Sequence, residues 1–118
     1  MFKEKIILSI TLSHTKSLII PVTSSANIEI NTFRPGREDV ESLEETLESV
    51  ISTLYSIKDN PEEFLGSVRV RFEHRRLLGS EYLLSKEYPI GEGEDRDQMI
   101  LDAIRGMETI LTKIRGME

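Results

Sequence analysis

The sequence contains no cysteine. A chain without cysteine forms no disulfide, no thiolate zinc site and no cysteine nucleophile. Long hydrophobic runs are missing as well. The first apolar run, residues 6–8, is broken at Ser9 and is too short for the core of a signal peptide. No stretch approaches the roughly 18 apolar residues of a membrane span. These absences predict a cytoplasmic protein that has no contact with a membrane.

Positive charge is the scarcer kind in this chain. Lysine and arginine number 15 against 21 aspartate and glutamate residues, which gives a net charge of −6. Since phosphate affinity comes from accumulated lysine and arginine, we expect no direct binding of nucleic acid. The content of 38% hydrophobic and 31% charged residues is typical of a globular chain. The length of 118 residues predicts a single domain over residues 1–118.

The sequence also lacks the usual signatures of catalysis. There is no glycine-rich phosphate loop, no Walker lysine, no nucleophile elbow and no His-Glu-x-x-His helix. His14 and His74 are the only candidates for general acid–base chemistry. Neither has a carboxylate or a second histidine at ligand spacing, so we interpret both as structural residues at strand ends. We therefore expect no enzyme activity, no cofactor and no metal site.

Alternation of apolar and polar residues predicts several β-strands. The first covers residues 5–14, with Ile6, Leu8, Ile10 and Leu12 on one face. A second covers residues 18–22, where Pro21 indicates an edge strand or a bend. A break at residues 24–27 separates it from a third over residues 28–33. Two further strands are predicted around residues 68–73 and 82–88.

Apolar residues at spacings of three and four predict two long helices. The first helix carries Val40, Leu43, Leu47, Val50, Leu54 and Ile57 on one stripe, which also satisfies a heptad seam. The second carries Ile100, Ile104, Met107, Leu111 and Ile114. Asp95 and Gln98 predict a capping box before this helix. Residues 60–63 predict a short helical turn that ends at Gly66.

These elements predict an α+β fold, in which an antiparallel sheet of four to five strands carries two long helices on one face. The order is ββ(β)α-ββα, with strands followed by a helix in each half. Residues 8–14 align loosely with residues 68–74, and both segments end in histidine. Two explanations are open. The halves are a degenerate internal duplication, or they are two independent hairpin–helix units.

Two charged segments are candidate binding sites for a partner. The acidic residues Glu41, Glu44, Glu45 and Glu48 crowd the first helix. They form either a solvated face or a mimic of the phosphate backbone that occupies the nucleic-acid site of another protein. Arg69 and Arg71 lie on the polar face of their strand. They either grip an anionic partner or pair with glutamates of neighbouring strands.

Some strands are apolar on both faces, namely residues 18–22 and the pair Leu83 and Leu84. The second apolar face of such a strand must also be buried, and in a short chain it usually packs against another subunit. We therefore predict a non-catalytic, self-associating assembly protein that acts through protein–protein contacts, either as a homo-oligomer or with another protein, as a component of a larger particle. The alternative is a small acidic inhibitor, of the kind that phages encode, that mimics nucleic acid.

Overall fold

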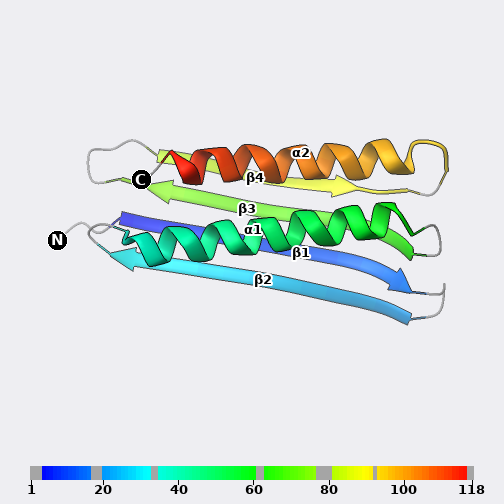
Figure 1. Cartoon of the computed structure of the whole chain (residues 1–118), viewed down its shortest axis with the longest axis horizontal. Helices are drawn as coiled ribbons and strands as arrows, with labels where there is room; N and C mark the ends of the chain where they lie inside the picture. Colours follow the sequence, from blue (N-terminus) through cyan, green and yellow to red (C-terminus); the bar gives the residue numbers. More distant parts are fainter. Residues whose placement is uncertain are drawn as a thin grey trace.

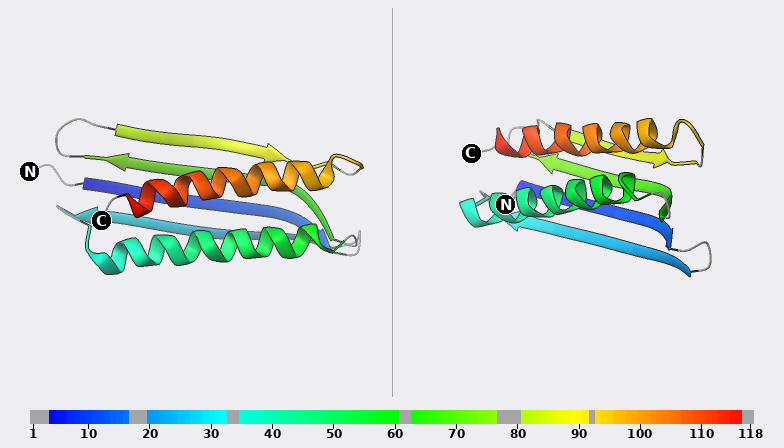
Figure 2. Two further views of the ribbon diagram at one scale, coloured as in Figure 1. Left: turned by 45° about the horizontal axis from the view of Figure 1, so that its top comes forward. Right: turned by 45° about the vertical axis from the view of Figure 1, so that its right-hand side comes forward.

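The computed structural model describes residues 4–16, 20–32, 35–60, 63–76, 81–91 and 93–116. The elements, in chain order, are β1 (Glu4–Lys16), β2 (Ile20–Thr32), α1 (Arg37–Lys58), β3 (Glu63–Arg75), β4 (Glu81–Pro89) and α2 (Arg96–Arg115). The four strands form one antiparallel sheet in the order β2-β1-β3-β4. Both helices lie on the same face of this sheet (Figures 1 and 2). The predicted α+β class and the order of strands and helices are confirmed.

The core lies between the sheet and the helix layer, where the alternating strands predict it. The even-numbered residues from Ile6 to Leu12 in β1 are at most 5% exposed, as are Val68, Val70 and Phe72 in β3. All six residues of the predicted α1 stripe are buried in the same cluster. The stripe therefore packs within its own chain.

The prediction of a break at residues 24–27 was wrong, because β2 runs through them as one strand of 13 residues. Polar side chains of this stretch bond to the neighbouring strand: Ser9 donates to Asn27, and Thr11 lies beside Ser25. β2 is an edge strand, so one side of its backbone faces away from β1. A proline is tolerated in such a strand when its nitrogen lies on the outer side, because no hydrogen bond to the neighbouring strand is then lost. The sheet therefore has four strands among the described residues, and not five.

The predicted helical turn before Gly66 was also wrong. Pro61 and Glu62 lie outside the described residues, and from Glu63 onward the chain is strand β3. Ser13 pairs with Ser67 and His14 with Leu65, so Gly66 is an extra residue in a β-bulge. A Cβ atom at Gly66 would lie 3.3 Å from the carbonyl oxygen of Ser13, a tight approach that glycine avoids.

The capping box predicted for α2 does not form. Asp95 is the N-cap residue, but its side chain makes no capping hydrogen bond. Gln98 instead donates to Asp102 one turn further along the helix, at 3.0 Å. The helix itself begins and ends close to the predicted positions.

A constant offset of 60 residues relates the two ββα halves. Leu8 pairs with Ile28, and the residues 60 positions later, Val68 and Tyr88, pair in the same way. The buried α1 residues from Val40 to Leu54 recur in α2 at the same offset, as Ile100, Ala103, Met107, Ile110 and Ile114. A duplication of one ββα unit predicts this gap-free correspondence, whereas two independent units need not share one offset. The structure thus favours the duplication.

Candidate interaction surfaces

The sheet face that carries no helix forms a regular polar grid. Each row of the grid contains one residue from each strand, in the order β2, β1, β3 and β4. The rows are Asn31-Lys5-Arg75-Glu81, Glu29-Ile7-Glu73-Leu83, Asn27-Ser9-Arg71-Ser85 and Ser25-Thr11-Arg69-Glu87. The β1–β2 half carries hydroxyl and amide groups together with Lys5, Ile7 and Glu29, the arginines lie on β3, and Ile7 and Leu83 are the apolar members of the grid.

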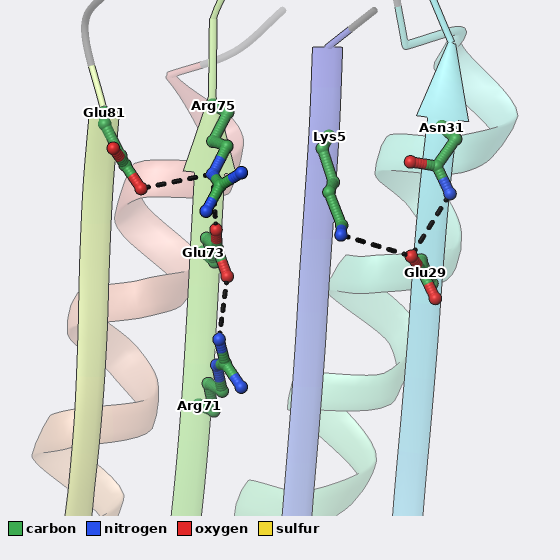
Figure 3. Close-up of polar contacts among 7 residues, drawn as sticks. All are labelled: Lys5, Glu29, Asn31, Arg71, Glu73, Arg75 and Glu81. Atoms are coloured by element: carbon green, nitrogen blue, oxygen red, sulfur yellow. Dashed lines mark hydrogen bonds and ion pairs between the residues drawn. The ribbon is translucent and has the colours of Figure 1, made fainter.

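Arg71 and Arg75 of this face are paired with carboxylates of the same chain (Figure 3). Glu73 accepts from Arg71 at 3.0 Å and faces Arg75 at 2.7 Å, and these neighbours leave it only 3% exposed. Arg75 also reaches Glu81, at 3.2 Å. Further along, Arg69 pairs with Glu87 of β4 at 3.5 Å. Arg69 thus pairs with a glutamate of the neighbouring strand, as one of the two sequence-based interpretations has it, whereas Arg71 pairs with Glu73 of its own strand.

The predicted acidic residues lie in the other layer of the molecule. Glu41, Glu45 and Glu48 are exposed on α1, while Glu44 is half-buried. Cations lie next to two of them: Arg37 pairs with Glu41 at 3.2 Å, and Arg115 of α2 with Glu48 at 3.0 Å. The sheet separates these acids from Arg69 and Arg71, so the predicted partner-binding residues do not form one site.

The two histidines are far apart. His74 pairs in register with Ile6, and His14 lies eight residues further along β1, which corresponds to about 26 Å. His74 is buried, with its Nε2 atom 3.3 Å from a carboxylate oxygen of Glu4. In the described part of the chain, no group of three or more histidine, aspartate or glutamate residues could hold a metal ion.

An open groove of about 580 Å³ runs between the outer surfaces of the two helices. Ile51, Tyr55 and Leu111 form its apolar wall, and Glu48 and Arg115 pair across it. Its ionisable side chains are exposed and spread along two helices, so the groove offers no constellation for acid–base or nucleophilic chemistry.

The two outer flanks of the molecule differ strongly, although the offset of 60 residues makes them equivalent positions in the two halves. On the β4 flank, large side chains close the space between sheet and helix. The Tyr88 ring occupies the space beside Gly106, where an added Cβ would collide with it. Lys113 of α2 lies over the ring of Tyr82 at 4.4 Å, and Lys86 lies over that of Tyr88 at 4.8 Å. These contacts show that Gly106 and Lys113 lie on the β4 side of α2.

Among the described residues, the equivalent flank beside β2 carries smaller side chains and a single charge, Glu29. In place of Tyr88 and Lys86 of β4 there are Ile28 and Ala26. The positions equivalent to residues 102, 106, 109 and 113 of α2 are Ser42, Thr46, Ser49 and Thr53 of α1, and this equivalence places them toward β2. We call these four residues, together with residues 22–31 of β2, the β2 flank. Sequence patterns alone do not reveal it, because its two parts meet only in the folded chain.

Sequence reasoning also missed Arg96, at the start of α2. Its guanidinium donates to three carbonyl oxygens at the end of α1: Ile57 at 2.7 Å, Asn60 at 3.1 Å and Lys58 at 3.2 Å. These carbonyls lie at and just beyond the C-terminus of α1, where helix carbonyls lack a full set of intrahelical partners and a cation is also favoured by the helix dipole. Arg96 therefore joins the two helices and has a structural role.

The chain matches no protein-family model, no curated protein and no solved structure. Among the described residues, neither helix is long and apolar enough to cross a lipid bilayer.

Proposed function

We propose that this protein is a non-catalytic, self-associating interaction protein of the cytoplasm, which acts through protein–protein contacts as a component of a larger particle. The observation that carries the proposal is the difference between the two flanks. Large side chains close the β4 flank, whereas the described side chains of the β2 flank are smaller and carry a single charge, Glu29. An exposed edge strand invites pairing with another chain, and monomeric proteins usually protect such an edge.

The distribution of charge supports the same proposal. The β4 edge carries Glu81, Lys86, Glu87 and Pro89 within nine residues, which are the residue types that protect an edge strand. The described side chains of β2, residues 23–32, include a single charge, Glu29. On the open face the arginines are neutralised within the chain, so an anionic ligand would have to displace existing carboxylates.

Self-association is tested by sedimentation velocity and native mass spectrometry of the purified chain over a micromolar-to-millimolar range. We expect a concentration-dependent oligomer. A strict monomer that also recovers no partner from extracts of the native host would refute the proposal.

The nucleic-acid mimic is the second candidate, and the exposed row of Glu41, Glu45 and Glu48 favours it. The row is short, and Arg37 and Arg115 neutralise part of its charge. A mimic would bind a nucleic-acid-binding protein with strong salt dependence. Replacing Glu41, Glu44, Glu45 and Glu48 with glutamine would then abolish partner binding at low salt, whereas self-association through β2 would persist.

A further inference from the structure

We infer that the β2 flank binds the β2 flank of a second copy of this chain. Two β2 strands then pair antiparallel about a two-fold axis, and two four-stranded sheets join into one sheet of eight strands with all helices on one face. This inference rests on the proposed function, because it names the surface through which the chain self-associates.

The backbone of β2 supplies the first part of the argument. On its outer side, residues 22–31 have no strand partner in the described part of the chain. Ten residues of extended chain present a row of N–H and C=O groups about 33 Å long. Strand addition at a sheet edge uses such a row for main-chain hydrogen bonds. Pro21 limits the row at one end, because it has no N–H group.

The side chains of β2 make it complementary to itself. Residues that face each other across a two-fold antiparallel pair lie on the same sheet face. With Ala26 on the axis, Glu29 faces Thr23 of the partner subunit, and with Asn27 on the axis it faces Ser25 of the partner subunit. Neither register opposes like charges, which would destabilise the pair.

The α1 part of the flank is compatible with the same arrangement. Thr46 and Thr53 donate their hydroxyls to carbonyl oxygens of their own helix, those of Ser42 and Ser49, both at 2.9 Å. These hydroxyls need no external partner, so the surface is easily dehydrated. In α2 the position equivalent to Thr53 is Lys113, and two such lysines facing each other across an axis would repel.

The size of the flank agrees with a stable dimer. The molecule is 19 Å thick through sheet and helices. Over the length of the unpaired row, each copy contributes about 600 Å² of flat area, or about 1,200 Å² in total, which exceeds the roughly 1,000 Å² expected of a biological interface. A two-fold interface uses the same patch on both copies, so the dimer is closed. The charged residues and Pro89 on β4 prevent further strand pairing at the other edge of the sheet.

Disulfide trapping tests the register directly, because the chain has no cysteine of its own. A residue on the two-fold axis faces its own copy, within the Cα separation that a disulfide bridges. We therefore expect A26C or N27C to form a covalent dimer under mild oxidation. The matched control is E87C, 60 residues beyond Asn27 on the other edge strand, which should remain monomeric.

A charge variant tests the same interface without oxidation. With Ala26 on the axis, S25K/N27K places two pairs of lysines opposite each other, and we expect the dimer dissociation constant to rise by about a hundredfold. With Asn27 on the axis, the lysine at position 27 still faces its own copy, but the lysine at position 25 faces Glu29 of the partner subunit, so we expect a smaller rise. S85K/E87Q makes the same change in net charge at equivalent places on β4 and should leave the constant unchanged. Circular dichroism reports whether each variant is folded.

The outcomes separate the two proposals. Trapping at β2 together with dissociation of S25K/N27K supports the inference. If the wild type self-associates while neither A26C nor N27C is trapped, and S25K/N27K does not weaken the oligomer, the β2 interface is wrong and the proposed function stands. A wild type that stays monomeric and is not trapped contradicts both.

Discussion

Arg96 shows how much one side chain contributes when it donates to several backbone carbonyls. Its three hydrogen bonds to the end of α1 fix the relative position of the two helices. R96A removes all three hydrogen bonds, which come from a charged side chain that is only 13% exposed. We expect a loss of about 2–3 kcal/mol in the free energy of unfolding, measured by urea denaturation. R96K keeps the charge but not the fork of donors and should fall in between. An unchanged midpoint for R96A would contradict this role.

Gly106 is a second residue whose role depends on one contact. Alanine in a helix interior is favoured over glycine by about 1 kcal/mol, but here its methyl group would displace the Tyr88 ring. Overpacking of this kind costs about 1–3 kcal/mol, so we expect G106A to destabilise the wild type or at best to be neutral. In a Y88A background the same change should stabilise by up to about 1 kcal/mol. Thermal denaturation of the four chains checks this reversal of sign, and equal effects in both backgrounds would refute the contact.

At the scale of the element, each turn of α1 has one side buried in the core and one side exposed to solvent. Leu47 is fully buried in the core of its own chain. L47A should therefore lower the free energy of unfolding by about 2–5 kcal/mol, whatever the protein concentration. E45A, two residues away on the exposed face, should change it by less than about 0.5 kcal/mol. Chemical denaturation at two concentrations checks both values. A folded L47A monomer of normal stability that no longer self-associates would instead indicate that the stripe is a seam between subunits.

For the whole molecule, a dimer through the β2 flank couples folding to association. The melting temperature of the wild type should then rise by a few degrees with each tenfold increase in concentration, because mass action favours the associated folded state. In S25K/N27K the melting temperature should not depend on concentration. Differential scanning calorimetry over two decades of concentration checks this, and a wild-type melting temperature independent of concentration would contradict the coupling.

Local periodicity in the sequence is sufficient to predict the elements and the buried face of each. Alternation in β1 and β3 and the three-to-four spacing in both helices give the direction of each side chain relative to its own backbone. The core residues, the one-sided helix layer and the α+β class follow from that direction. The same local reasoning failed at residues 24–27 and at Gly66, where bonds to a neighbouring strand override weak strand propensity.

The contacts that define the candidate surfaces were decided only by the tertiary structure. The pairing of Arg69 with Glu87, the three carbonyls bound by Arg96 and the meeting of β2 with one side of α1 all join segments that are distant in sequence or depend on register. Register is a long-range property, since shifting one strand by a single residue exchanges its two faces. The sequence by itself therefore determined what each segment becomes and which side it buries. Which groups face each other, and which flank is left uncovered, depended on the packing of the two halves.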